Sequence, residues 1–244
     1  MTYVMSDIHG CFDRYSEMLD LIDFSDNDTL FVIGDVIDRG DGSVLLLQDM
    51  SMRANVIPIM GNHEYAACSV LPQMLMLMQE ITEESSEELL KTGLEKGIDV
   101  MKFAEDVNAW NEIGGDATIQ GFRELPADER EYLLEYLEEF SLYEIVKVNG
   151  KKYVLTHFGL PAGATAKNLD TFDAWDFVTA EMNYNKQYFN DAFLVTGHLP
   201  TFEVDESARG RIYRNCNNIS IDAGAIAGEK LACLCLDTDE EFYV

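Results

Sequence analysis

The chain has 244 residues, 47% of them hydrophobic, which is enough to build one large α/β domain over residues 1–244. Its 17 Lys and Arg against 45 Asp and Glu give a formal net charge of −28, so we expect neither nucleic acid nor an anionic membrane surface as a partner. No stretch approaches the roughly 20 apolar residues of a membrane helix, and the start MTYVMSDIHG lacks the features of a signal peptide, so we expect a cytoplasmic protein.

Strand and helix patterns alternate in the first part of the chain. Runs of β-branched and apolar residues predict strands over 2–5, 29–34 and 55–61. Between them, residues 14–24 and 42–52 carry apolar side chains at helical spacing. This βαβαβ order predicts parallel strands joined by crossover helices.

The pattern becomes helical and strongly acidic from Leu71 to Phe140, through EITEESSEELLKTGLEKG and ADEREYLLEYLEEF. We interpret residues 71–140 as a helical insertion or cap within the same domain. Beyond it, strand patterns flank Asn149 and Gly150, a pair typical of a tight β-hairpin. Three further strands are predicted over 192–198, 218–224 and 230–237.

All four histidines follow predicted strands directly: His9, His63, His157 and His198. Asp35, Asp38 and Arg39 follow another strand in LFVIGDVIDRG. In open α/β sheets, ligands bind at the carboxyl ends of the strands. We therefore expect these polar groups to meet at one edge.

The types of side chain at that edge indicate a metal site. It would be built from carboxylate, amide and imidazole groups, namely Asp7, His9, Asp35, Asn62, His157 and His198. This set suits Mn, with Fe or Zn as alternatives, better than a soft-metal cysteine site. We expect two divalent ions, because one carboxylate can bridge two cations, and such a pair of cations binds the attacking and leaving oxygens of a phosphoryl displacement. Asp35 is the candidate bridge.

The motifs SDIHG, GDVIDRG, GNHE, THFG and TGH, in this order, resemble those of the calcineurin-like metallophosphoesterases. The DRG and GNHE forms are similar to the PPP-type serine/threonine protein phosphatases, especially the short bacterial and phage ones. The segments WNEIGGDAT and ISIDAGAIAGEKLACLCL also resemble those phosphatases, so the likeness covers nearly the whole chain. It implies an α/β/β/α sandwich.

The same resemblance implies a role for each candidate ligand. Asp7, His9 and Asp35 would hold the first metal, whereas Asp35, Asn62, His157 and His198 would hold the second. Many relatives end the last motif as Gly-His-x-His, but here Pro200 takes the place of the second histidine. The first metal would then keep three protein ligands and open positions for substrate.

The catalytic group implied by the resemblance consists of His63, Asp38 and Arg39. His63 would protonate the departing alkoxide, a step worth about 10²- to 10⁴-fold in rate, and Asp38 would hold His63. Arg39 would bind the phosphate oxygens. The attacking hydroxide would come from metal-bound water, so no covalent intermediate is needed.

Each of these residues also has a purely structural interpretation when taken alone. Asp35 could cap a helix, Arg39 could pair with Asp41, and Asn62 could serve a turn. The sequence also departs from the family pattern, because Phe177 occupies the place of a second phosphate-binding arginine. Arg209 is a possible substitute for that arginine, although its sequence context favours an exposed arginine on a loop.

Three functions remain open. The first is hydrolysis of phosphoserine or phosphothreonine in proteins, with a phosphoprotein or a small phosphorylated molecule as substrate. The second is symmetrical hydrolysis of dinucleoside tetraphosphates, as in a related bacterial branch that typically lacks the aspartate of DRG and ends in GNHD. Asp38 and Glu64 favour the first. The third is a metal-stabilised binding scaffold without catalysis, which His63 and Arg39 disfavour.

Overall fold

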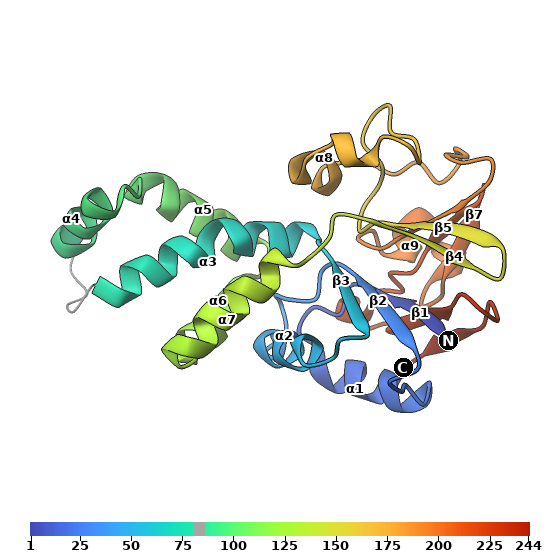
Figure 1. The fold of residues 1–244 in the computed structure, drawn as a ribbon, viewed down its shortest axis with the longest axis horizontal. Helices are drawn as coiled ribbons and strands as arrows, with labels where there is room; N and C mark the ends of the chain where they lie inside the picture. Colours follow the sequence, from blue (N-terminus) through green and yellow to red (C-terminus); the bar gives the residue numbers. More distant parts are fainter. Residues whose placement is uncertain (81–85) are drawn as a thin grey trace.

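The computed structural model describes residues 1–80 and 86–244, so residues 81–85 of the predicted insertion lie outside the described part. Two five-stranded sheets face each other, and a group of helices extends away from them (Figure 1). A buried cluster with side chains from both sheets, including Val4, Phe31, Leu155 and Val195, fills the space between them. This arrangement confirms the predicted sandwich.

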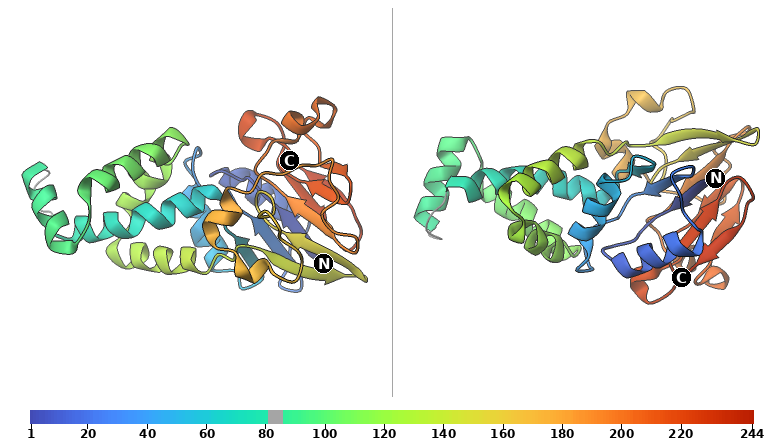
Figure 2. Two further views of the ribbon diagram at one scale, coloured as in Figure 1. Left: turned by 90° about the horizontal axis from the view of Figure 1, so that it is seen from above. Right: turned by 60° about the horizontal axis from the view of Figure 1, so that its bottom comes forward.

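The first sheet has the strand order β10-β9-β1-β2-β3. It contains the three strands predicted to be parallel. Its parallel members are β1 (Thr2–Met5), β2 (Thr29–Ile33) and β3 (Val56–Ile59), and its antiparallel members are β9 (Ala232–Cys235) and β10 (Glu241–Tyr243). The crossovers are α1 (Phe12–Leu21) and α2 (Ser43–Ser51), which cover the outer face of this sheet (Figure 2). The predicted βαβαβ unit is therefore confirmed.

The second sheet has the order β4-β5-β6-β8-β7. Its strands are β4 (Glu144–Val148), β5 (Lys151–Leu155), β6 (Phe193–Thr196), β7 (Tyr213–Asn215) and β8 (Asn218–Ser220). The predicted hairpin joins β4 to β5, and Asn149 (φ 50°) and Gly150 (φ 82°) both take the left-handed conformation that such a turn requires. Strands β5, β6 and β8 run parallel.

The outer face of the second sheet has a thinner cover than the first. Its regular elements are α8 (Ala174–Val178) and the 3₁₀ turn η1 (Leu169–Thr171), and loops supply the rest. The remaining short elements are α9 (Thr201–Val204), η2 (Glu206–Ala208) and η3 (Ala225–Ala227). The second helical layer of the sandwich is thus reduced largely to loops.

The described residues of the predicted insertion are mostly helical, with short connections between the helices. It contains α3 (Asn62–Glu80), α4 (Ser86–Lys96), α5 (Val100–Glu112), α6 (Asp116–Glu124) and α7 (Ala127–Glu138), which form the arm that projects from the sheets in Figures 1 and 2. The first helix begins at Asn62, earlier than the expected start at Leu71. The carboxylate of Glu64 explains this, because it accepts the N–H of Gly61 (2.9 Å) and so caps a helix that starts directly after β3.

Within the described residues, no helix is both long and apolar enough to cross a membrane.

Candidate metal centre

The parallel strands of both sheets deliver polar side chains to one edge, at their carboxyl ends. β1 and β2 lead into Asp7, His9 and Asp35, and β3 leads into α3, which opens with Asn62 and His63. β5 and β6 lead into His157 and His198. The structure therefore brings together side chains that the sequence spreads over most of the chain.

Two of the imidazole rings are held in a fixed orientation by backbone carbonyl groups. His9 Nδ1–H donates to Ile37 O (3.0 Å), and His157 Nδ1–H donates to Ile33 O (2.9 Å). Each ring therefore turns Nε2 toward the cluster. Such a hydrogen bond is the usual support of a histidine that binds a metal.

Asp35 lies at the centre of the cluster. Its carboxylate oxygens are 3.7 Å from His9 Nε2, 3.2 Å from His157 Nε2 and 3.7 Å from His63 Nε2. Two groups of potential metal ligands emerge, His9–Asp35–His63 and Asp35–His157–His198, with ligand atoms within 4.8 Å of one another in each. Asp35 is common to both groups, which is the arrangement expected of a bridge.

The other two predicted ligands, Asn62 and Asp7, lie outside these two groups. Asn62 Oδ1 lies 3.3 Å from His157 Nε2, beside the second group. Asp7 stands apart from both groups, and its two carboxylate oxygens lie 3.1 and 3.0 Å from the backbone nitrogen of His198, which donates its N–H to them. His63 takes part in the first group by distance, although its other ring nitrogen is bonded to Asp38.

The protonation equilibria of the cluster suit bound cations. Burial lowers the pKa of His9 and of His198 to about 4, which leaves both rings neutral, as metal binding requires. Burial also opposes a charge on His157, but Asp35 and Asp7 raise its pKa to about 10. Burial would raise the pKa of Asp35, yet His157, His63 and His9 hold it well below its usual value. Asp35 and Asp7 thus favour a positive charge beside them, and the donor set of the cluster fits divalent metal ions.

Backbone strain is concentrated in the same residues. Six of the predicted site residues have positive φ, namely Asp7 (53°), His9 (46°), Asp35 (51°), Asp38 (73°), Arg39 (69°) and His198 (68°). Residues with a Cβ rarely adopt this conformation, and it persists where surrounding contacts enforce it, often at functional sites. Gly34 and Gly61 allow the close approach, because a Cβ at Gly34 would lie 2.5 Å from the His157 ring and one at Gly61 would collide with Asp35.

Glu64 fixes the backbone segments that carry the cluster. Its buried carboxylate accepts the N–H groups of Asp35 (2.9 Å), Val36 (2.8 Å), Ile37 (3.2 Å) and Gly61 (2.9 Å). It therefore ties the loop after β2 to the start of α3. The sequence carries a signal for this capping role, because Glu64 lies three residues beyond Gly61 in GNHE.

His63, Asp38 and Arg39 form a second group beside the cluster. His63 Nδ1–H donates to Asp38 Oδ2 (2.6 Å), and His63 Nε2 lies 3.4 Å from Arg39 Nη2. Asp38 also accepts hydrogen bonds from Trp110 Nε1 and Thr118 Oγ1, both 2.5 Å long. Trp110 and Thr118 begin and end the segment WNEIGGDAT, whose resemblance to the short phosphatases implies no role for either residue.

Phe177, which takes the place of a second phosphate-binding arginine, and Arg209, its possible substitute, are both engaged elsewhere. Phe177 is buried and stacks on Tyr143, with ring centroids 5.5 Å apart, in the core outside the second sheet. Arg209 pairs with Glu206 (2.7 Å) and Glu229 (3.1 Å) and lies over the Phe202 ring. These contacts agree with the surface-loop interpretation of Arg209.

Asp222 is a residue of this edge that sequence reasoning missed. It follows β8 as directly as Asp35 follows β2, so the same rule of a polar residue after a parallel strand could have found it. Burial raises the pKa of Asp222 to about 6, and the charge of Asp222 contributes to the raised pKa of Asp7. Asp222 therefore adds to the negative charge of the edge.

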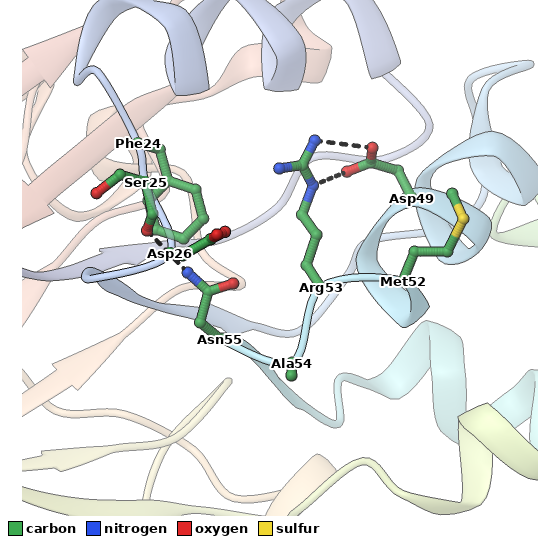
Figure 3. Close-up of a pocket in the computed structure, with 8 residues that line it drawn as sticks. All are labelled: Phe24, Ser25, Asp26, Asp49, Met52, Arg53, Ala54 and Asn55. Carbon is green, nitrogen blue, oxygen red and sulfur yellow. Dashed lines mark hydrogen bonds and ion pairs between the residues drawn. The ribbon is translucent and has the colours of Figure 1, made fainter.

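Two hollows differ in their relation to the cluster. One of about 570 Å³ adjoins it, with Asn62, Tyr65, Trp110, Ile113 and Trp175 in its walls, and offers room for the body of a substrate. Another, of about 590 Å³, lies at the opposite ends of β2 and β3 (Figure 3). There the guanidinium of Arg53 is bonded twice to Asp49 (2.7 and 3.1 Å), so it is already neutralised.

Comparison with known proteins identifies the family. The family model described as calcineurin-like phosphoesterase matches residues 2–222. The chain belongs to this family. Members of the calcineurin-like family are hydrolytic phosphoesterases that use a dinuclear divalent metal centre, which agrees with the cluster around Asp35.

Individual relatives differ in how much of the chain they match. A symmetrical bis(5'-nucleosyl)-tetraphosphatase of Wigglesworthia glossinidia brevipalpis is 41% identical over 64 residues, which cover 25% of this chain and 24% of the relative. The chain thus matches only about a quarter of the length of that relative. The asymmetrical bis(5'-nucleosyl)-tetraphosphatase PrpE of Halalkalibacterium halodurans is 26% identical over 95% of this chain and 88% of its own.

Solved structures of two similar proteins share the fold over the whole chain. A putative diadenosine tetraphosphatase superposes with a TM-score of 0.63 at 14% identity, covering 100% of this calcineurin-like chain and 92% of its own. A protein serine/threonine phosphatase from Saccharomyces cerevisiae superposes with a TM-score of 0.57 at 14% identity, covering 100% and 79%. At these identities the likeness concerns the fold alone.

Proposed function

We propose that this calcineurin-like phosphoesterase is a metal-dependent phosphatase that hydrolyses phosphoserine and phosphothreonine in proteins. One observation carries the proposal: the ring of His63 lies between the guanidinium of Arg39 and the cluster of potential metal ligands. Its Nε2 is 3.4 Å from Arg39 Nη2 and 3.7 Å from Asp35 Oδ2, while its Nδ1 is bonded to Asp38. An acid in this position suits a leaving group that must be protonated, as serine and threonine alkoxides must.

We propose the following ligands for the two metals, which we expect to be Mn²⁺. Asp7, His9 and Asp35 would hold the first, and Asp35, Asn62, His157 and His198 would hold the second. Cations bound there would polarise the phosphoryl group and lower the pKa of the attacking water. The separation of Asp7 from the first ligand group is compatible with this scheme, because its carboxylate is buried at the same edge and held by the His198 N–H.

The other groups of the site would act directly on the substrate. Arg39 is exposed, so its guanidinium can reach a phosphate, and it would bind the oxygens that gain charge in the transition state. His63 would hold a proton on Nε2 and pass it to the departing oxygen. The Asp38 carboxylate, bonded to Nδ1–H, would stabilise the doubly protonated ring, so that transfer of the Nε2 proton leaves a neutral ring with its remaining proton on Nδ1.

The variant His63→Asn tests this assignment with phenyl phosphate and 4-nitrophenyl phosphate. These two substrates have similar size, but only the phenolate of phenyl phosphate is a poor leaving group. We expect kcat for phenyl phosphate to fall about 10²-fold, and kcat for 4-nitrophenyl phosphate to fall about tenfold or less, with metal content retained. Equal losses on both substrates, with both metals still bound, would show that His63 is not the acid.

A second candidate function is hydrolysis of dinucleoside tetraphosphates. It is favoured by the relative named as an asymmetrical tetraphosphatase, which matches 95% of this chain. Product analysis with diadenosine tetraphosphate would identify it: symmetrical cleavage gives two ADP molecules, and asymmetrical cleavage gives ATP and AMP. The acidity of the chain favours the phosphoprotein instead, because a compact polyanion needs several basic groups around it.

We also propose that residues 1–244 fold as one domain that includes the helical arm. Trp110, Phe122 and Leu133 of the arm belong to the same buried cluster as Tyr3 and Met18 of the first sheet and its helix. A shared core of this kind is typical of a single folding unit.

A further inference from the structure

The turn that carries Asp38 and Arg39 is held in an unfavourable backbone conformation. Both residues have positive φ, 73° and 69°, and both carry side chains for which this conformation is rare. Asp38 is fully buried, so its charge and its backbone N–H must find partners within the protein. Strained and buried groups of this kind persist only where surrounding contacts fix them.

A segment of the helical arm far away in sequence supplies those contacts. Trp110, in α5, donates its indole N–H to Asp38 Oδ2, and Thr118, in α6, donates its hydroxyl to Asp38 Oδ1, each at 2.5 Å. Between them, Gly114 O accepts the backbone N–H of Arg39 (2.9 Å). Trp110 and Thr118 are each 1% exposed, so water does not compete for these bonds.

These bonds fix the Asp38 carboxylate from both sides. Oδ2 is shared between His63 Nδ1–H (2.6 Å) and the Trp110 indole, while Oδ1 is bonded to Thr118. The plane of the carboxylate is therefore set by the arm, and the direction of the His63 ring is set by the carboxylate. Loss of either donor would let the carboxylate rotate and would move His63 Nε2 away from the leaving oxygen.

We propose that Trp110 and Thr118 are positioning residues through which the helical arm aligns Asp38 and His63 for protonation of the leaving group. The inference rests on the proposed role of His63 as acid. It adds a catalytic task for the arm, whose residues Trp110 and Thr118 act on the reacting atoms through the Asp38–His63 pair. Small displacements of an acid of this type cost large factors in rate.

Thr118→Val and Thr118→Ser form the decisive pair of variants. Valine matches threonine in shape but lacks the hydroxyl, whereas serine keeps it, and the Asp38 N–H retains Ser43 Oγ (2.9 Å) as an acceptor in both. Trp110→Phe likewise removes the indole N–H. Thr92→Val is the matched control, because Thr92 is a buried threonine of α4 in the same arm.

The readout is the ratio of kcat for 4-nitrophenyl phosphate to kcat for phenyl phosphate. We expect Thr118→Val and Trp110→Phe to raise this ratio about 3- to 10-fold over the parent protein, with KM changed less than about twofold, because proton transfer is impaired and binding is not. Thr118→Ser should restore the parent ratio, and Thr92→Val should leave it as it is. Thermal melting and metal content, measured on each variant, show that the fold and the metals persist.

The outcomes separate this inference from the proposed function. If His63→Asn raises the ratio but Thr118→Val and Trp110→Phe do not, the positioning role is refuted and the acid role of His63 stands. If Thr118→Val and Thr118→Ser raise it equally, the hydroxyl bond is not the cause and the proposal also fails. If His63→Asn itself leaves the ratio unchanged, the acid assignment and the positioning role fall together.

Discussion

Asp35 is the residue that joins the two groups of potential metal ligands. Its carboxylate lies within 3.7 Å of three imidazole nitrogens, and its backbone N–H is bonded to Glu64. Its φ of 51° turns the side chain into the cluster, and Gly61 leaves room for it. The positive φ of Asp35 and the absence of a Cβ at Gly61 thus place the Asp35 carboxylate where two cations could share it.

Metal content should distinguish this bridge from an ordinary ligand. We expect Asn62→Ala to lower bound Mn²⁺ from about two equivalents per chain to about one, and Asp35→Asn to weaken both sites, because a bridging carboxylate serves two ions. Elemental analysis after equilibrium dialysis measures this directly. The assignment of Asp35 would be wrong if Asp35→Asn kept one tightly bound ion while Asn62→Ala kept none.

At the scale of elements, the loop between α5 and α6 connects the helical arm to the site. Gly114 and Gly115 let this loop pass close to Arg39 and Trp110: a Cβ at Gly114 would lie 2.7 Å from Arg39 Cγ, and one at Gly115 would lie 2.6 Å from the Trp110 ring. Gly115 has an ordinary helical backbone (φ −70°), so space and not conformation requires glycine there.

Gly115→Ala should therefore disturb catalysis as well as stability. We expect it to cost about 1–3 kcal/mol in the free energy of unfolding through overpacking, and to raise the ratio of kcat for 4-nitrophenyl phosphate to that for phenyl phosphate, because Trp110 must shift. Gly97→Ala is the control: Gly97 has φ +72° with nothing within 4 Å, so alanine there costs about 1–2 kcal/mol of backbone strain alone. A Gly115→Ala protein with the parent ratio would argue against the loop as a support of Asp38.

The elements and the strand-end residues could be predicted from the sequence because their signals are local. A strand followed at once by Asp or His predicts a polar group at the sheet edge, and Asn149–Gly150 predicts its hairpin. The support of Asp38 could not be predicted, since Trp110 and Thr118 lie 72 and 80 positions away from it along the chain. Contacts of that separation depend on how the arm packs on the sheets, which no local pattern encodes.

At the scale of the whole molecule, the two sheets divide the proposed site between them. The first contributes Asp7, His9 and Asp35, and the second contributes His157 and His198, so the cluster forms only where both sheets meet. The ordered motifs made the sandwich predictable. They did not predict the thin outer cover of the second sheet, because the loops there carry no regular periodicity.

The net charge of −28 is a property of the whole molecule, and it affects which substrates can approach the site. A strongly acidic protein repels a tetraphosphate chain at long range, whereas a phosphopeptide can offset its single phosphate with basic neighbours. We therefore expect Lys or Arg beside the phosphorylated residue to raise kcat/KM at low salt, with a smaller gain at high salt, because ions screen exposed charges.

The most direct test compares kcat/KM for a phosphoserine or phosphothreonine peptide with that for diadenosine tetraphosphate. The Mn²⁺-loaded protein is assayed with both substrates at two ionic strengths, and chelated protein serves as the inactive control. The proposed function predicts a higher kcat/KM for the phosphopeptide at both ionic strengths, and activity that returns when Mn²⁺ is restored. Faster cleavage of the tetraphosphate at both ionic strengths would contradict it and would assign the chain to dinucleotide hydrolysis.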